Sequence, residues 1–427
     1  MNQQADELSN GDERPSMKPF LVVWSGQAFS LLGSQMVQFG LVWWLTAATG
    51  SPQVLALASL AAILPQVILG PLAGALVDRW NRKAVMVAAD TGIALATLIL
   101  VALFWLGRVE IWHIYVLMLV RACGTAFHLP AMQASTTLMV PRESLARVGG
   151  MNQTLAGLIG IVTPLLGALA VEALPIAGVL AIDVVTAIPA VVTLLLVSIP
   201  QPVRTAEPAA GAGRAWVLDD MRYGLRYLWG WKALMALAAV GVTINMFGRA
   251  AGSLAPLLVL DHFQAGAPGL GWWQSADGIG LVLGGVVLGI WGGFRRKVVT
   301  QMLFLALDGL AILLVGLLPA GGFWPAIGLI FISGFSEAVI LGLGGAIFQT
   351  LVAPEIQGRV FSLLISLSMA AMPLGLLVAG PLAEALGVPF WWALTGTVFI
   401  ATAATALALP AVARIEDSRG RITVPLS

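Results

Sequence analysis

The stretch that decides the fold is Gly70-Pro71-Leu72-Ala73-Gly74-Ala75-Leu76-Val77-Asp78-Arg79-Trp80-Asn81-Arg82-Lys83. It starts as an apolar segment with spaced glycines and ends in one carboxylate and several cations. Apolar blocks at residues 53–77 and 84–106 surround its charged end, and each is long enough to cross the bilayer core, which takes about 20 residues. Glycine lets neighbouring helices approach closely, whereas charges are expensive within hydrocarbon. We therefore expect the charged end to connect two membrane-spanning helices at the membrane surface.

The composition of the whole chain agrees with a membrane protein. Of 427 residues, 59% are hydrophobic and 10% are charged, whereas soluble domains are about 45–50% apolar and about 25% charged. The net charge of +1 gives no basic surface for nucleic acid. The single cysteine, Cys123, excludes a disulfide framework and a thiolate metal cluster. The three histidines lie far apart without acidic neighbours at ligand spacing, so neither a metal nor a cofactor is expected.

The apolar residues fall into twelve blocks, which predict an all-α membrane protein with twelve transmembrane helices. The blocks cover residues 19–46, 53–77, 84–106, 111–138, 145–170, 175–198, 233–260, 269–293, 298–319, 323–350, 358–384 and 389–412. A long polar stretch separates the sixth block from the seventh, and the other connections are short. The expected domains are an N-terminal tail (1–18), a six-helix bundle (19–198), a linker (199–232), a second six-helix bundle (233–413) and a C-terminal tail (414–427).

The basic residues predict the orientation in the membrane. With the N-terminus inside, the 22 Lys and Arg residues fall on the cytoplasmic side, apart from Arg108 in an outer loop and Arg121 and Arg249 within spans. This is the distribution that the positive-inside rule describes. We expect a multi-pass protein of the cell inner (plasma) membrane with both termini cytoplasmic. Residues 214–232 alternate basic and aromatic side chains and predict an amphipathic helix on the inner membrane face.

The two halves contain related segments in the same order. Thr-Thr-Leu-Met-Val-Pro at 136–141 precedes Arg147, and Gln-Thr-Leu-Val-Ala-Pro at 349–354 precedes Arg359. Asp90 in the third block likewise parallels Asp308 in the ninth. Many secondary transporters consist of duplicated halves, which rock around a substrate site at the repeat interface. The repeat therefore predicts two pseudo-symmetric bundles.

The opening stretch resembles the second-to-third-span motif of the major facilitator superfamily, G-x-x-x-D-R-x-x-R-K. The matching residues are Gly74, Asp78, Arg79, Arg82 and Lys83. The resemblance implies the major facilitator fold. It also implies a cytoplasmic charge cluster that latches the two halves in one state and releases them in the other. The alternative is that these bases only enforce the topology.

The fifth block resembles a partial form of the antiporter motif found in exporters of this superfamily. It contains Gly157, Gly160, Pro164 and Gly167, with Thr163 in place of one expected glycine. The resemblance implies a helix bend at the domain interface and transport out of the cell. Close packing of small residues is the alternative.

A further resemblance is to the macrolide-efflux branch of the superfamily. It rests on Trp24-Ser25-Gly26-Gln27-Ala28-Phe29-Ser30-Leu31, on Arg121-Ala122-Cys123-Gly124-Thr125-Ala126-Phe127-His128 and on Ala181-Ile182-Asp183. It implies export of drug-like molecules. An exporter of a native metabolite such as a siderophore, or a lysophospholipid transporter, remains the alternative.

Three charged residues, Arg121, Arg249 and Glu337, fall near the middle of predicted spans. A charge at that depth costs about 2.5–3.5 kcal/mol and normally faces a cavity or a partner. In the superfamily, spans one, four, seven and ten line the central cavity, so the resemblance places all three charges there. Together with polar neighbours at helical spacing, the predicted substrate cavity contains Gln27, Ser34, Gln38, Arg121, Thr125, His128, Asn245, Arg249 and Glu337.

Glu337 is the predicted proton carrier, because the protonation of a carboxylate depends on its solvation and on nearby cations. Alternate exposure to the two sides of the membrane would couple inward proton movement to substrate exit. Arg121 is the preferred partner of Glu337, and a purely structural Arg–Glu pair is the alternative. Asp90 and Asp308 are further coupling candidates, although bonding between helices within one half is the more common task of such residues.

The sequence contains no nucleotide-binding lysine motif and no arrangement of Ser, His and Asp that suggests hydrolysis. ATP is therefore not the expected energy source, and an enzyme is a weaker hypothesis than a carrier. A channel is also less consistent with two repeats around a charged cavity. We expect a monomeric secondary active exporter of amphiphilic small molecules, macrolide-like or other drugs, driven by protons through alternating access. Its partners would be a small-molecule substrate, protons and membrane lipid, and not nucleic acid.

Overall fold

The computed structural model describes residues 17–77, 79–201, 232–352 and 357–413. Asp78 of the loop motif lies outside these ranges. So do nearly all of the predicted amphipathic helix at 214–232, most of the N-terminal tail and the whole C-terminal tail. The described residues contain twelve helices that are long and apolar enough to cross a membrane, which confirms the predicted number of spans and the all-α class.

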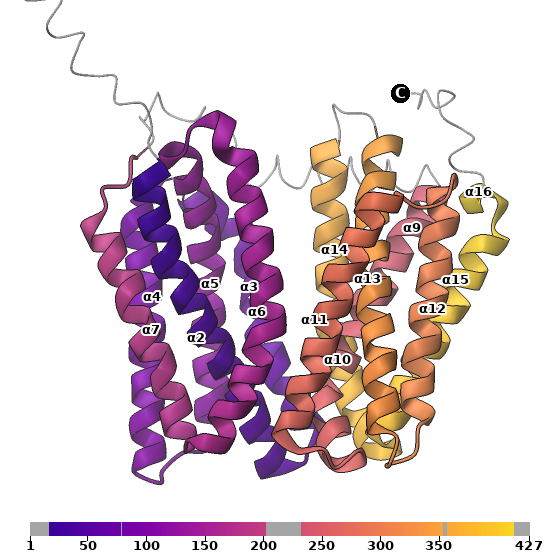
Figure 1. Ribbon diagram of the computed structural model, residues 1–427, viewed down its shortest axis with the longest axis horizontal. Helices are drawn as coiled ribbons and strands as arrows, with labels where there is room; N and C mark the ends of the chain where they lie inside the picture. Colours follow the sequence, from indigo (N-terminus) through magenta and orange to yellow (C-terminus); the bar gives the residue numbers. More distant parts are fainter. Residues whose placement is uncertain (1–16, 78, 202–231, 353–356, 414–427) are drawn as a thin grey trace, which may run out of the picture. The chain divides into compact units, whose positions relative to one another are not determined.

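Helices of the N-terminal half form one bundle in Figure 1. They are α2 (Met17–Thr49), α3 (Pro52–Val77), α4 (Arg82–Trp105), α5 (Ile111–Met139), the short 3-10 helix η1 (Arg142–Ser144), α6 (Leu145–Ala173) and α7 (Ile176–Leu196). Helix α4 packs against both α5 and α7. Apolar side chains near the ends of these helices form a buried cluster, which includes Phe20, Val77, Met86 and Leu194. Burial of this surface stabilises the bundle.

Helices of the C-terminal half form a second bundle in Figure 1. They are α9 (Lys232–Thr243), the π-helical segment η2 (Ile244–Gly248), α10 (Arg249–Leu257), the π-helical segment η3 (Leu258–His262), α11 (Gly266–Trp291), α12 (Lys297–Leu317), α13 (Phe323–Leu351), α14 (Gln357–Leu386), α15 (Val388–Ala408) and α16 (Pro410–Ala413). Helix α13 packs against α11 and α12, and α12 also packs against α15.

The seventh predicted span, 233–260, is interrupted by two π-helical turns. Such turns are rare and occur often at functional sites. The first of them, η2, ends directly before Arg249. The backbone of α14 lies close to this turn, because a Cβ atom at Gly375 would overlap the carbonyl oxygen of Met246.

The chain divides into two compact units. The first comprises Met1–Leu41, Ala61–Ile159 and Ala170–Thr205, and the second comprises Val42–Leu60, Gly160–Leu169 and Ala206–Ser427. The change of unit between residues 205 and 206 falls within the predicted linker, 199–232. The five predicted domain ranges themselves stay a prediction.

Candidate functional site

The first unit contains a cavity of about 830 Å³ lined by residues of α2, α3, α4, α5 and α6. This volume is in the range of pockets that hold drug-sized ligands, about 300–1,000 Å³. All the residues that the sequence placed in the cavity from α2 and α5 line it in the structure. They are Gln27, Ser34, Gln38, Arg121, Thr125 and His128.

Arg121 is paired with Asp183 on α7. Its Nη1 atom donates a hydrogen bond to Asp183 Oδ2 at 2.5 Å, and its Nη2 atom donates to the Ser34 carbonyl oxygen at 3.0 Å. Asp183 is 2% exposed and also accepts hydrogen bonds from the Ser34 hydroxyl at 2.7 Å and the Thr97 hydroxyl at 3.1 Å. Arg121 thus has an acidic partner within its own unit, and its preferred pairing with Glu337 stays a prediction. A fully bonded carboxylate on α7 already neutralises this guanidinium.

Asp90 is also bonded within the first unit. It accepts a hydrogen bond from the Gln27 side-chain amide at 2.9 Å. Its other oxygen lies 3.3 Å from His128 Nε2. The Asp90 side chain is largely buried, and the three side chains line the same cavity. Asp90 and Arg121 therefore have hydrogen-bond partners within the unit, whereas His128 Nε2 is buried without a hydrogen bond among the described residues. The described residues contain no group of three His, Cys, Asp or Glu side chains that could hold a metal ion.

The second unit contains a smaller pocket, of about 270 Å³, lined by residues from η2, α10, α11, α12, α13 and α15. Arg249 Nη2 and Glu337 Oε1 lie 3.5 Å apart, and their side chains are 55% and 31% exposed. Asp308 is 5% exposed and accepts a hydrogen bond from the Ser333 hydroxyl at 2.6 Å. Asp277 from α11 lines the same pocket. Three carboxylates and one guanidinium therefore share this pocket.

Asp277 was not among the site residues predicted from the sequence. A signal was present, because Asp277 interrupts the apolar block 269–293, where an acidic residue is costly without a cavity or partner. Asn245 was predicted in the substrate cavity, and that placement stays a prediction. Asn245 does not line the pocket, and its side-chain amide donates to the Gly241 carbonyl oxygen of the preceding turn at 3.0 Å. The π-helical turn that contains Asn245 changes the helical register on which the prediction depended.

The loop motif bonds to helix ends within the first unit. Arg82 Nη1 donates to the Ala134 carbonyl oxygen near the end of α5 at 2.9 Å. Lys83 Nζ donates to the carbonyl oxygens of Leu195 and Val197 at the end of α7, at 2.9 and 3.0 Å. Cations at helix C-termini satisfy free carbonyls and complement the helix dipole. These bonds stabilise one bundle, and the latch between halves stays a prediction.

Gly74 has open space around it among the described residues. A Cβ atom at this position would meet no described atom within 4 Å. The expectation that this glycine brings two helices together stays a prediction. In α6, Gly157, Gly160, Pro164 and Gly167 all lie inside one helix. Pro164 has no N–H to donate to the carbonyl oxygen one turn earlier, but the bend at the domain interface stays a prediction.

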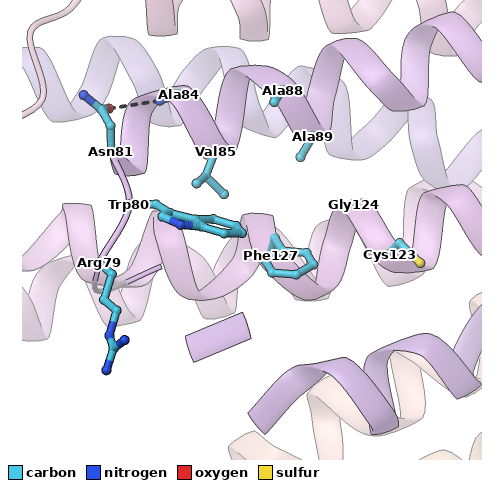
Figure 2. A pocket seen from close by; sticks show the side chains of 10 residues that line it. All are labelled: Arg79, Trp80, Asn81, Ala84, Val85, Ala88, Ala89, Cys123, Gly124 and Phe127. Carbon is cyan, nitrogen blue, oxygen red and sulfur yellow. Dashed lines mark hydrogen bonds between the residues drawn. The ribbon is translucent and has the colours of Figure 1, made fainter. Parts of the chain in front are cut away.

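A second hollow of the first unit, of about 710 Å³, lies between the start of α4 and the later turns of α5. Figure 2 shows its side chains: Trp80 lies beside Phe127, and the Asn81 side chain accepts a hydrogen bond from the Ala84 N–H at 3.0 Å. The two rings are stacked with centroids 6.0 Å apart. Asn81 is thereby the N-cap of α4, a position that favours Asn. Alanines of α4 and the segment around Cys123 line the rest, so this hollow is mainly apolar and we call it the α4–α5 groove.

Relatives among known proteins are membrane transporters. The chain is 34% identical over 387 residues to macrolide efflux protein A of Streptococcus pyogenes, covering 90% of this chain and 94% of that protein. It is 33% identical over 330 residues to macrolide efflux protein A of Enterococcus faecalis, covering 77% and 100%. It is also 29% identical over 392 residues to the multidrug efflux pump Tap of Mycobacterium tuberculosis, covering 88% and 89%.

Solved structures agree on the fold. A mutant of the nucleoside transporter NupG superimposes with a TM-score of 0.69 at 16% identity, covering 92% of this chain and 99% of that chain. A bacterial homologue of the iron transporter ferroportin, in an inward-facing state, has a TM-score of 0.65 at 15% identity, covering 91% and 99%. At these identities the likeness concerns the fold alone.

The family described as "Transmembrane secretion effector" matches residues 15–423, which is nearly the whole chain. Together with the efflux relatives, this match confirms the resemblance seen in the loop motif and in the macrolide-efflux segments. The protein is a multi-pass membrane transporter and not an enzyme. It belongs to the transmembrane secretion effector family of the major facilitator superfamily.

Proposed function

We propose that the protein exports amphiphilic small molecules, macrolide-like or other drugs, from the cytoplasm in exchange for protons, by alternating access in the plasma membrane. The efflux relatives, which align over most of their length, support drug export. The predominance of basic residues in the predicted cytoplasmic segments supports an orientation with both termini inside. An exporter of a native metabolite such as a siderophore, or a lysophospholipid transporter, is the alternative.

The observation that carries the proton coupling is the charge imbalance of the pocket in the second unit. Asp277, Asp308 and Glu337 line it, and Arg249 is its one cationic side chain among the described lining residues. Asp308 is 5% exposed, and a buried carboxylate without a cation bonded to it is costly to keep ionised. Protons can balance the surplus of negative charge. In the first unit, by contrast, Asp183 has a guanidinium partner.

Glu337 is the proposed carrier, with Arg249 as its partner. Their separation of 3.5 Å and their partial exposure describe a weak ion pair that solvent can reach, so protonation of Glu337 would release Arg249 at small cost. A carboxylate whose surroundings change between two conformations can bind a proton in one and release it in the other. Asp308, and in the first unit Asp90 with Arg121, are secondary candidates for the same task.

Proton movement in proteoliposomes tests this assignment. Purified protein is reconstituted with an internal pH dye, and the macrolide erythromycin is added under an imposed pH gradient. We expect Glu337→Gln to reduce erythromycin-driven proton movement at least tenfold. Glu172→Gln, which removes an exposed carboxylate outside the pocket, is the matched control and should behave like the wild type.

Three outcomes would contradict parts of the proposal. Undiminished coupling in Glu337→Gln would remove Glu337 as carrier. Flux that rises without saturation and ignores the gradient would indicate a channel. A wild-type protein that moves siderophore or lysophospholipid, but no drug from a panel, would favour the alternative function.

A further inference from the structure

The cavity of the first unit is lined by an unusual number of amide side chains. They come from α2, α3, α5 and α6 and are Gln27, Gln35, Gln38, Gln66, Gln133 and Asn152. Polar side chains in membrane spans normally face a partner or a cavity. Here they line a single cavity, so its wall contains several amide hydrogen-bond donors and acceptors.

Three of these amides are already bonded to the protein. Gln27 donates to Asp90 at 2.9 Å, and Gln66 donates to the Ala62 carbonyl oxygen of its own helix at 3.1 Å. Asn152 accepts a hydrogen bond from the indole N–H of Trp24 at 2.8 Å. These residues form part of the cavity wall, and at least one polar group of each is already hydrogen-bonded to the protein.

The other three amides, of Gln35, Gln38 and Gln133, have no hydrogen-bond partner among the described residues. All three retain solvent-accessible surface. Each side-chain amide offers two N–H donors and a carbonyl acceptor. They therefore present unused donors and acceptors to whatever occupies the cavity.

The charged side chains Arg121 and Asp90 of the same cavity, by contrast, already bond to other protein groups. The Arg121 guanidinium is bonded to Asp183 and to the Ser34 carbonyl oxygen, and Asp90 is bonded to Gln27 and lies against His128. What remains for a ligand is neutral hydrogen bonding together with apolar surface from residues such as Leu129 and Met132. This combination differs from the carboxylate-rich pocket of the second unit.

We propose that Gln35, Gln38 and Gln133 form a specificity-determining subsite for the uncharged, oxygen-rich face of an amphiphilic substrate. Its ligand would have several hydroxyl, ether or carbonyl groups on an apolar scaffold. The inference rests on the proposed export function and adds which substrates are preferred and which residues distinguish them. A site whose polar groups must pair with substrate oxygens rejects analogues that lack them, because the site is then left with unpaired groups.

The test compares two probes bound by the purified full-length protein. Erythromycin supplies many hydroxyl and carbonyl groups, whereas tetraphenylphosphonium is an amphiphilic cation without oxygen. We expect Gln38→Met and Gln133→Met each to raise the dissociation constant for erythromycin roughly tenfold, the equivalent of one lost polar contact. The dissociation constant for tetraphenylphosphonium should stay within twofold.

The matched control is Gln153→Met, which changes the same residue type at an exposed position of α6 that does not line the cavity. It should leave erythromycin binding unchanged. Thermal unfolding of each variant is measured first. Any site at which methionine lowers the melting temperature by more than a few degrees is tested again with leucine and with threonine.

Several results would overturn the inference. One is an equal loss of both probes in a variant with the wild-type melting temperature. Another is unchanged erythromycin binding in Gln38→Met and Gln133→Met. A wild-type protein that exports tetraphenylphosphonium but binds no oxygen-rich amphiphile would refute the subsite while leaving the export function intact. A wild-type protein that transports neither probe would refute both.

Discussion

Individual buried carboxylates in this protein have very different surroundings. Asp183 accepts hydrogen bonds from three side chains, including the guanidinium of Arg121. Asp308 is similarly buried, but the hydrogen bond described for it comes from the hydroxyl of Ser333. The first arrangement ties four helices together. The second leaves a carboxylate whose charge has no cation bonded to it within the described residues.

Asp183→Asn is therefore expected to destabilise the first unit strongly. The substitution leaves the mostly buried Arg121 guanidinium without its counter-charge, and breaking one side of a buried ion pair costs about 3–5 kcal/mol. The measurement is thermal unfolding of the purified protein in detergent, read as a fall in melting temperature. The double variant Arg121→Met with Asp183→Leu should recover much of the loss, because apolar replacements of both partners are often tolerated. A single variant as stable as the wild type would contradict the pairing.

The sequence predicted cavity residues better than their partners. Gln27, Ser34 and Gln38 were identified from polar spacing on one helix face, and Arg121 from the cost of a charge in a span. All four line the cavity. The partner of Arg121 could not be identified in this way, because pairing depends on which neighbouring helix faces α5. That information is absent from the spacing within any single helix.

At the level of helices, close packing depends on glycines other than those of the loop motif. Gly280 and Gly284 lie one turn apart on α11 and face α13. A Cβ atom at either would overlap backbone atoms of Phe331 or Phe335. The Gly-rich character of α11 is evident in the sequence, but which glycines face a partner depends on the rotation of the helix.

Gly280→Ala should therefore lower the stability of the second unit, since the backbone of α13 cannot move as a flexible side chain could. Gly285→Ala on the same helix is the matched control, because a Cβ atom there meets nothing within 4 Å. Alanine in a helix interior is favoured over glycine by up to about 1 kcal/mol, so the control should be neutral or slightly more stable. Equal melting temperatures for the two variants would show that α11 and α13 do not pack at Gly280.

The sequence also predicted the extent of the helices but not their π-helical turns. The apolar block 233–260 corresponds to the continuous run of α9, η2, α10 and η3. Amphipathic spacing assumes 3.6 residues per turn, and a π-helical turn shifts every following side chain relative to that pattern. Asn245 lies within the π-helical turn η2 and Arg249 follows it directly; of the two, Arg249 is the one that lines the pocket of the second unit.

At the scale of the whole molecule, the two units differ in the chemistry of their cavities. Amides and neutralised charges line the larger cavity, and carboxylates dominate the smaller pocket. The internal repeat, visible in paired segments such as Asp90 and Asp308, predicted the common architecture. It could not predict this difference, because the partners of each aspartate come from helices whose repeat counterparts have diverged in sequence.

Reporter fusions test the proposed orientation. We expect alkaline phosphatase to be active when fused after Arg108, between α4 and α5, and inactive when fused after Arg296, between α11 and α12. The reason is the cluster Arg295, Arg296 and Lys297, which the positive-inside rule places in the cytoplasm. Green fluorescent protein fused after Ser427 should fluoresce. The reverse pattern of phosphatase activity would place the termini outside and contradict the proposed orientation.

The α4–α5 groove has a practical consequence. Cys123 lies in it next to Gly124 (Figure 2), and the chain has no other thiol. The native protein is thus already suited to site-specific attachment of a maleimide-linked fluorophore or nitroxide. Emission wavelength or spin-label mobility at this position would show how the surroundings of the groove respond during turnover. Such spectroscopy requires no prior removal of competing cysteines.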